Sequence, residues 1–465
     1  MRIRNWVIAL TLVFNAAAAE WQQVVDPAEA GWSVERLAAA RAKAESIGSA
    51  AVMVVDSGRT IVAWGDVERR FRSASLRKSL ISVMVGNAVA RKQIDLDATL
   101  ASLGIDDLQP LTAEEKRATV RDLISARSGV YHPAAKVTSG QVESRPERGS
   151  HAPGTFWFYN NWDFNVAGGI LARATKTDPG ELFLRDIAGP AGMQDFRAKD
   201  FYWEPEPRVT RHAAFDFRIS ARDLARLGVV LLNGGVSNGR RVVPEAWIRE
   251  SIRIVSPLGD GSGYGYMWWI HPETSKYFGL SVAPGERLSG SYAAEGAGAQ
   301  ILFVLPSKNL VIVHRGDTDF GTGVDETKAL ALIAEIVQAK TAAGARRQAV
   351  RPLRAEPFSK TLPPLVEYDP IPVDDSTRAA LVGTYDIASR MKVEIFDHEG
   401  RLFIAAPGRP DVQLHGYAKD RYFARSLRLL VDAERGENGE IVAIRAVLQG
   451  KPMRGVRIAS APRSE

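Results

Sequence analysis

A serine and a lysine three residues apart open a helix-like segment near the start of the chain. Residues 72–81 read RSASLRKSLI, in which Ser75 and Lys78 form an SxxK pattern. Because residues three apart share one face of a helix, the Lys78 amine can reach the Ser75 hydroxyl. The amino end of the helix adds positive potential and free backbone N–H groups. The spacing therefore predicts an activated serine nucleophile; the alternative for an isolated SxxK is a first helical turn with a solvated lysine.

A tyrosine and an asparagine stand before a second apolar, helix-like run. Residues 153–161 read PGTFWFYNN, with Tyr159 and Asn161 in a YxN pattern, and the apolar run follows at 164–170. A phenol near an amine can relay the proton that a serine nucleophile loses and return it to the leaving group. We expect Tyr159 to share proton transfer with Lys78, and Asn161 to hold the lysine or a substrate carbonyl. The alternative is a half-buried tyrosine whose hydroxyl is bonded locally.

In their order and flanking residues these motifs resemble the serine β-lactamase and penicillin-binding-protein superfamily, specifically its class C-like branch of esterases, amidases and D-amino-acid peptidases. The resemblance covers roughly residues 21–340 and includes VRDLISARSGV at 120–130, ISARDLARLG at 219–228 and YGYMWW at 264–269. It implies a serine hydrolase that forms an acyl-enzyme on Ser75, with Lys78 and Tyr159 in proton transfer. Neither a cofactor nor a metal is expected.

The third motif of that family is altered in this chain. Members carry Lys-Thr-Gly or His-Thr-Gly on a strand, whereas residues 294–300 read AEGAGAQ and include no basic residue. By the resemblance, the N–H groups of Ser75 and Ala299 would form the oxyanion hole, with Gly298 beside them and a possible slip of one or two residues. In the family the basic residue helps to grip a substrate carboxylate, so its absence disfavours penicillin hydrolysis.

Four tryptophans near the motifs suggest an aromatic-walled pocket for a small ester, amide or peptide-like substrate, although aromatic side chains beside motifs also serve in packing. We assign Trp157 and Trp268 to the pocket wall; the other two are Trp162 and Trp269. Two alternatives remain. The protein could be a β-lactamase in which an arginine such as Arg287 or Arg315 replaces the missing basic residue, or a non-catalytic binding or sensor protein that retains the penicillin-recognition fold.

Two further patterns are weaker. Residues 235–239 read GVSNG and fit the GxSxG nucleophile elbow. That elbow needs a strand before the serine and a helix after it, whereas a helix is expected at 224–232, so Ser237 is not favoured. The seven histidines show no HExxH or paired spacing, which argues against a metal site. His132 and His151 flank the motif region and are candidates for lining the cleft.

Composition excludes several other classes of protein. The chain has 465 residues, 45% hydrophobic and 25% charged, which is typical of a soluble globular protein and long enough for two domains. Without cysteine there is no disulfide, thiolate nucleophile, zinc ribbon or iron–sulfur cluster. The 60 basic residues exceed the 54 acidic ones by 6 but are scattered along the chain, so nucleic acid is not an expected partner.

The first 19 residues have the pattern of a secretory signal peptide. MRIRNWVIALTLVFNAAAA combines two early arginines, an apolar run at 6–14 and small residues at the expected cleavage site. The run is shorter than the roughly 20 residues that cross a bilayer as a helix, and no later segment is long and apolar enough. We expect a periplasmic or secreted protein that begins near Glu20 and has no transmembrane span; a retained membrane anchor is the alternative.

Strand-like segments at both ends of residues 20–345 enclose a helix-rich middle. This order predicts an α+β hydrolase domain, in which an antiparallel sheet is flanked by helices and accompanied by a helical subdomain. The expected elements are a helix at 33–47, a hairpin of 51–55 with 60–64, a hairpin of 300–305 with 310–314, and a helix at 325–340.

Prolines are dense in residues 346–375, which predicts an extended linker. Beyond it, residues 376–465 contain short alternating runs such as 392–396 and 401–404, separated by turn signals, as in a small antiparallel β-domain or barrel. LVGTY at 381–385 resembles the GxY opening of lipocalin-like domains that follow such hydrolases. This domain carries no catalytic constellation, so we interpret it as a cap or partner surface, or alternatively as a stabilising appendage.

Overall fold

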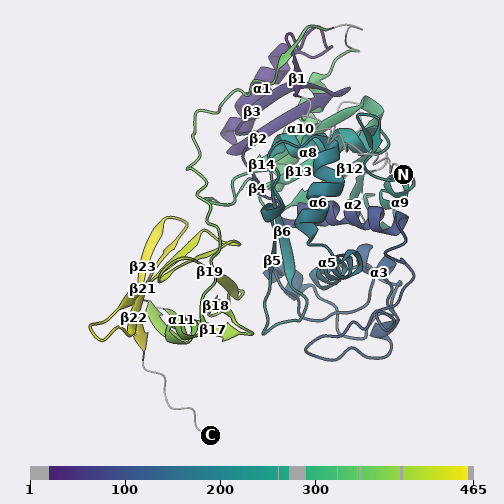
Figure 1. The fold of residues 1–465 in the computed structure, drawn as a ribbon. Helices are drawn as coiled ribbons and strands as arrows, with labels where there is room; N and C mark the ends of the chain where they lie inside the picture. Colours follow the sequence, from purple (N-terminus) through teal and green to yellow (C-terminus); the bar gives the residue numbers. More distant parts are fainter. Residues whose placement is uncertain are drawn as a thin grey trace, which may run out of the picture.

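The computed structural model describes residues 20–259, 261–271, 290–321, 323–342, 344, 348–387 and 391–458. The expected signal peptide at 1–19 and Arg287 lie outside these residues. The chain forms a mixed α/β unit followed by a separate β-barrel (Figure 1). The predicted fold class is therefore confirmed. Across the described ranges, no helix has both the length and the apolar character that a membrane crossing requires.

A 10-stranded sheet forms the centre of the first unit. Its neighbouring strands are antiparallel, except that β1 and β3 run parallel. The two expected hairpins are confirmed as β2–β3 and β13–β14. In sheet order the strands are β15 (Val350–Pro352), β1 (Gln22–Val24), β3 (Arg59–Gly65), β2 (Ser49–Asp56), β14 (Leu310–Gly316), β13 (Gln300–Leu305), β12 (Ser291–Gly296), β11 (Trp269–His271), β10 (Gly263–Tyr264) and β9 (Ser256–Pro257).

Helices cover both faces of this sheet because alternate strand residues point to opposite sides. Helices α1 (Val34–Ser46) and α10 (Glu326–Ala339) pack against each other and against one face, where Val52 and Val54 are buried. Helix α8 (Ala221–Leu232) lies on the other face against β2, β13 and β14. Gly228 allows this close approach, since a Cβ there would lie 2.5 Å from Val311 Cγ1.

The chain between β4 and β6 is largely helical and builds the lobe below the sheet in Figure 1. Helix α2 is tied to the sheet, since Ser79 and Ser82 donate to the carbonyls of Met267 and Tyr266 at 2.6 and 2.7 Å. The helical elements are η1 (Ala74–Leu76), α2 (Arg77–Ala90), η2 (Glu115–Arg117), α3 (Val120–Ile124), α4 (Ser139–Glu143), α5 (Asn161–Thr175), α6 (Pro179–Phe183), η3 (Leu184–Ala188), α7 (Gly189–Ala191) and η4 (Ala198–Asp200).

Two small sheets complete the first unit. One has the strand order β4 (Phe71–Arg72), β6 (Ala214–Ile219), β5 (Phe201–Glu204), and it lies beside the amino end of α2. The other pairs β7 (Val236–Ser237) with β8 (Arg240–Arg241) and is followed by α9 (Glu245–Ser251). A helix precedes Ser237 and a strand follows it, so the GxSxG pattern is not a nucleophile elbow.

The proline-rich segment runs along the first unit before it reaches the barrel (Figure 1). Its start forms β15, which pairs with β1 at the edge of the large sheet. Phe358 packs against β3, since a Cβ at Gly65 would lie 2.7 Å from its ring. Farther along, Arg69 Nη1 donates to the Pro363 carbonyl at 2.7 Å. A large part of the expected linker is thus attached to the sheet unit.

The C-terminal unit is a closed antiparallel barrel, which confirms the prediction of a small β-domain or barrel. Its core includes Tyr385, Ile395, Leu402 and Val431, all buried. Helix α11 (Asp375–Leu381) leads into the barrel, and the Tyr385 hydroxyl donates to the Leu381 carbonyl at 2.6 Å. The strands are β16 (Gly383–Ile387), β17 (Met391–His398), β18 (Arg401–Ala405), β19 (Val412–Ala418), β20 (Arg421–Ala424), β21 (Leu429–Arg435), β22 (Ile441–Leu448) and β23 (Lys451–Ile458).

Candidate active site

Ser75 lies in the short helix η1, directly before α2. The preceding residue, Ala74, has a φ of 48°, a left-handed conformation that is uncommon for a residue with a side chain. Ser73 fixes this turn to strand β6, because its N–H donates to the Phe217 carbonyl at 2.9 Å and its hydroxyl donates to Asp216 Oδ1 at 2.7 Å. The backbone at the candidate nucleophile is therefore held by a neighbouring strand.

Lys78 is brought within hydrogen-bond distance of Ser75. Its Nζ lies 2.9 Å from Ser75 Oγ, as expected for side chains one helical turn apart. The lysine side chain is buried, and Nζ lies 4.6 Å from the ring centre of Tyr159 and 5.0 Å from that of Phe164. The SxxK spacing thus places the Lys78 amine beside the Ser75 hydroxyl, and the fold adds the phenol ring of Tyr159 from a distant segment.

The surroundings of Lys78 favour its neutral form. Burial lowers the pKa of Lys78 well below its ordinary value, and the positive charges of Arg77 and Lys136 lower it further, while Asp216 acts in the opposite direction. A neutral amine can accept a proton, whereas an ammonium cannot. Lys78 therefore has the electrostatic setting of a general base.

Asp216 and Lys136 form a buried charged cluster next to this group, which was not predicted from the sequence. Asp216 on β6 is fully buried, and its Oδ2 lies 2.7 Å from Lys136 Nζ and 3.6 Å from Arg72 Nη2. Burial alone would raise the pKa of Asp216, but Lys136 and Arg72 outweigh it and hold the pKa below its usual range. The available signal was a carboxylate within the hydrophobic strand pattern AFDFRI at 214–219.

Tyr159 is half-buried and stacks on Trp269, with ring centres 5.6 Å apart. Burial raises the pKa of Tyr159 to about 12, although a hydrogen bond with Ser75 acts in the opposite direction. The phenol is consequently protonated at neutral pH and in contact with the candidate nucleophile. It can donate a proton to a group that leaves from a carbonyl bound to Ser75.

Asn161 begins helix α5 beside the same group. Its Nδ2 donates to the backbone carbonyl of Lys136, so the amide group is oriented by the loop that carries the lysine. Its Oδ1 is buried and has no hydrogen-bond partner within the described part of the chain. That oxygen is an acceptor placed near the site, and the substrate-binding role of Asn161 stays a prediction.

The tryptophans divide between the site and the core. Trp157 is half-buried, with its ring centre 5.7 Å from Tyr264 and 6.3 Å from Trp269, and its assignment to the pocket wall stays a prediction. Trp268 is 1% exposed and packs edge-on against Tyr292, so it belongs to the core and not to a pocket wall. The neighbour that contacts Tyr159 is Trp269, because consecutive residues point to different sides of the backbone.

The third motif reaches the nucleophile at Gly296. A Cβ on Gly296 would lie 2.9 Å from the Ser75 amide nitrogen and 2.4 Å from the Ser73 carbonyl oxygen, so the end of β12 packs directly against the turn. Ala299 instead has a buried side chain, and its carbonyl oxygen lies 2.7 Å from His314 Nδ1. Gly298 packs against Gly323, where a Cβ would lie 2.3 Å from the Gly298 Cα. The residue of this segment that packs on the Ser75 amide is thus Gly296, and the assignment of Gly298 and Ala299 to the oxyanion hole stays a prediction.

The residue that follows Gly296 is Ala297, which is exposed at the start of the turn before β13. Its N–H follows directly after the residue that contacts Ser75. In this register the contact with Ser75 falls at Gly296, and residues 297–299 form the turn between β12 and β13. A segment of alternating glycine and alanine offers no side chain from which this register could be deduced.

The charge at the third motif is acidic. Glu295 is 5% exposed on β12, and its carboxyl group shares a hydrogen bond with Glu326 in the first turn of α10. Loss of hydration and the neighbouring Glu295 raise the pKa of Glu326 above its ordinary value. Arg315, a possible replacement for the missing basic residue, is buried, and its guanidinium donates to Gln300 Oε1 at 2.8 Å and to the Arg72 carbonyl at 2.9 Å. The Arg315 guanidinium thus binds groups of the protein itself, including the backbone next to η1.

A family model decides the relationship of this chain to known proteins. Residues 34–334, more than half of the chain, match the model described as Beta-lactamase. The chain belongs to the beta-lactamase family. The resemblance inferred from the SxxK and YxN motifs is therefore confirmed.

Individual relatives of this chain are distant. An uncharacterized protein of Alkalihalophilus pseudofirmus is 22% identical over 277 residues, which are 55% of this chain and 75% of that protein. A structure from Bacillus anthracis, assigned the name 6-aminohexanoate-dimer hydrolase, aligns with a TM-score of 0.52 and 19% identity over 70% of this chain and 88% of the other. The octameric penicillin-binding protein homologue from Pyrococcus abyssi covers 90% of this chain and 99% of its own, with a TM-score of 0.47 and 14% identity. The likeness to the Bacillus anthracis structure, with its TM-score of 0.52, shows a shared fold.

The two histidines named from the sequence have local partners in this beta-lactamase-family fold. His132 is buried, with Nε2 3.3 Å from Glu115 Oε1. His151 stacks on Phe156 with ring centres 4.0 Å apart, and its Nδ1 lies 3.2 Å from the Tyr131 hydroxyl. Among the residues that the structure describes, no group of three or more metal-ligating side chains could hold a metal ion.

Proposed function

We propose that this protein is a serine hydrolase that cleaves ester or amide bonds through an acyl-enzyme on Ser75. The observation that carries the proposal is the 2.9 Å distance between Lys78 Nζ and Ser75 Oγ, in surroundings that lower the pKa of the lysine. A protein that only binds its ligand has no need for a buried amine beside a serine hydroxyl. Membership of the beta-lactamase family supports the same chemistry.

Acylation begins with proton transfer from Ser75 Oγ to the neutral Lys78 amine. A bond forms between Oγ and the substrate carbonyl carbon, and the carbonyl oxygen becomes an oxyanion. Two backbone N–H groups, those of Ser75 and Ala297, are proposed to hold this oxyanion, because Gly296 brings the two chain segments into contact.

Tyr159 completes acylation. Its phenol, protonated because its pKa is raised to about 12, donates the proton to the leaving oxygen or nitrogen as the bond to the carbonyl carbon breaks. The ammonium of Lys78 then returns the proton to the phenolate oxygen. In deacylation a water molecule gives up a proton to the same pair and attacks the ester carbonyl. The pair returns this proton to Ser75 Oγ as the bond between Oγ and the carbonyl carbon breaks, which releases the carboxylic acid and regenerates the serine hydroxyl.

The charge at the third motif supports substrates without an anionic group at that end. Glu295 lies within the third motif and Glu326 in the first turn of α10, and both raise the pKa of Tyr159 through their charge, so their field reaches the site. A substrate carboxylate placed there would meet like charge, whereas a neutral acyl group or an amine would not. Neutral esters and amides are thus favoured over penicillins.

Covalent labelling tests this proposal. The full-length mature chain is treated with a fluorophosphonate, and the modified peptide is found by mass spectrometry. We expect one label on Ser75 in the wild type and in Ser237→Ala, and none in Ser75→Ala, which removes a single hydroxyl and should leave the melting temperature nearly unchanged. Hydrolysis of p-nitrophenyl butyrate should disappear in the same variant. Label retained by Ser75→Ala, or activity without label on Ser75, would show that the nucleophile is another residue.

A further inference from the structure

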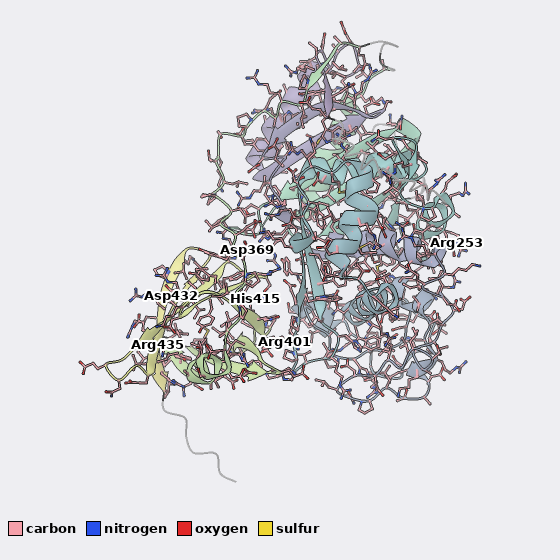
Figure 2. The ribbon with its side chains drawn as sticks, in the orientation of Figure 1. Arg253, Asp369, Arg401, His415, Asp432 and Arg435 are labelled. Atoms are coloured by element: carbon pink, nitrogen blue, oxygen red, sulfur yellow. The ribbon has the colours of Figure 1, made fainter. Side chains whose placement is uncertain are left out.

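A cavity of about 270 Å³ lies between the sheet unit, the proline-rich segment and the barrel. Its walls combine residues of all three parts, including Tyr202 from β5, Tyr368 from the proline-rich segment and Arg428 from the barrel. A smaller neighbouring hollow shares Tyr202 and Arg425 and includes His415. Figure 2 shows His415 and Asp369 on the side of the barrel that faces the sheet unit. The space has the dimensions of a small-ligand site.

Three cations at the cavity are neutralised by carboxylates. Arg197 lies 2.6 Å from Asp200 Oδ1, and Lys199 lies 2.7 Å from Asp369 Oδ1. Arg218 Nη2 lies 2.6 Å from Asp319 Oδ1. A further carboxylate at the cavity, Glu367, is bound by Arg197 and Arg70.

Two further guanidinium groups at the cavity have no carboxylate partner among the described residues. Arg425 makes a hydrogen bond from Nη1 to the Lys199 carbonyl at 3.5 Å, which is long for such a bond. Arg428 lies 4.1 Å over the ring of Phe320, and its Nη1 is buried without a hydrogen-bond partner. Burial lowers the pKa of both arginines, while the charges of Asp369 near Arg425 and of Asp319 near Arg428 act in the opposite direction without outweighing it.

Tyr202 adds an unpaired hydroxyl to the same cavity. The residue is 5% exposed, and within the described structure its Oη has no hydrogen-bond partner. A buried donor without an acceptor costs free energy, so native structures usually provide one. An anion in the cavity would accept from the Tyr202 hydroxyl and neutralise the neighbouring Arg425.

The remaining walls are largely apolar. They include Leu365, Val366, Leu427, Leu430 and Val447, together with the rings of Phe320 and Phe423. An inorganic anion would leave this surface uncovered, whereas a molecule with an apolar chain would cover it. Guanidinium groups also match the planar, two-oxygen geometry of a carboxylate.

We propose that the cavity between the sheet unit and the barrel is a binding site for a small amphipathic carboxylate, with Arg425, Arg428 and Tyr202 as its polar anchors. The apolar part of the ligand lies against the leucine and valine side chains of the proline-rich segment and the barrel. Because residues of both units contact it, the bound ligand links the barrel to the sheet unit. The proposal does not depend on the activity of Ser75.

Isothermal titration of the full mature chain with octanoate tests this site. We expect octanoate to bind. 1-Octanol and inorganic phosphate should bind at least tenfold more weakly, because octanol lacks the carboxylate and phosphate lacks the apolar chain. Arg425→Gln and Arg428→Gln should each weaken octanoate binding by about tenfold or more, since a hydrogen bond to a charged group is lost. The matched control is Arg401→Gln, an arginine of the same barrel that does not line the cavity and should leave the affinity unchanged.

Tyr202→Phe provides a variant that keeps the fold, because it removes one hydroxyl without a hydrogen-bond partner. It should weaken octanoate binding several-fold and leave the melting temperature of the free protein unchanged. In the wild type, octanoate should raise that temperature through linkage, and in Arg425→Gln it should not. The proposal is overturned if millimolar octanoate does not bind, if phosphate binds as tightly, or if Arg425→Gln and Tyr202→Phe retain wild-type affinity.

Discussion

Gly296 on strand β12 lies against the amide nitrogen of Ser75, and the contact leaves no room for a side chain. A Cβ at Gly296 would be 2.9 Å from that nitrogen and 2.4 Å from the carbonyl oxygen of Ser73. The strand and the nucleophile turn are therefore packed backbone to backbone. This contact brings the Ala297 and Ser75 N–H groups into the same region, where we propose that they stabilise the oxyanion.

Replacement of this glycine tests the packing. Gly296→Ala should lower kcat/KM for p-nitrophenyl butyrate by about a hundredfold, because the added methyl group displaces the amide that holds the oxyanion. The rate of fluorophosphonate labelling should fall in parallel. Gly169→Ala in helix α5 is the control, since a Cβ there meets no atom within 4 Å and its activity should be unchanged. Wild-type kinetics in Gly296→Ala would contradict the proposed oxyanion hole.

The pH dependence should report on Lys78. Its amine acts as a base when neutral, so kcat/KM should rise as pH increases through its lowered pKa and then reach a plateau. Lys136→Gln removes a cation that lowers the pKa of Lys78. The acidic limb of the kcat/KM profile, its rise with pH, should therefore move to higher pH by roughly one unit. Lys116→Gln, in which a partly exposed lysine bound to Asp106 is changed, should leave the limb in place. A limb that does not move in Lys136→Gln would contradict the assignment to Lys78.

Tyr159→Phe should affect substrates according to their leaving group. The phenol donates a proton to that group, so the loss in kcat should be about 10²–10⁴-fold for an anilide and much smaller for a p-nitrophenyl ester, whose phenolate leaves without a proton. The control is Tyr131→Phe, which also removes one phenol hydroxyl. That hydroxyl lies 3.2 Å from His151 Nδ1, so its loss should affect both substrates equally little. Equal losses with both substrates would assign Tyr159 to another step.

Two truncated chains test the contribution of the proline-rich segment. A fragment of residues 20–364 keeps β15 and Phe358, whereas a fragment of residues 20–349 loses both. The shorter fragment should have a free energy of unfolding lower by about 1–2 kcal/mol, the amount expected for loss of a half-buried aromatic side chain and a short strand pairing. It should also aggregate more, since the edge of β1 becomes exposed. Equal melting temperatures would show that the segment contributes nothing to the sheet unit.

Substrate charge provides a further measurement. The Glu295–Glu326 pair should make p-nitrophenyl butyrate a better substrate than nitrocefin by at least about tenfold in kcat/KM. Between two esters with the same leaving group, p-nitrophenyl butyrate should exceed mono-p-nitrophenyl succinate, which carries a carboxylate. Faster turnover of nitrocefin would show that another basic group replaces the missing residue of the third motif and would make β-lactamase the leading function.

The local geometry of the site follows from the sequence. The spacing of Ser75 and Lys78 requires only one helical turn to bring their side chains together. Turn residues between short apolar runs define the hairpins β2–β3 and β13–β14. These features depend on neighbours a few residues apart. Short-range sterics and hydrogen bonding therefore determine them before the rest of the fold is known.

Contacts between distant segments were decided by the tertiary structure. The glycine that meets Ser75 is Gly296 because of how β12 packs on η1, and a stretch of Gly and Ala carries no pattern that distinguishes one register from the next. The same applies to Asp216 and Lys136, 80 residues apart, which meet only when β6 lies beside the loop before α4. The periodicity of the sequence indicates which side chains share one face of a helix or strand. The packing of whole elements against each other decides which backbone amide and which charged group lie next to the reacting atoms.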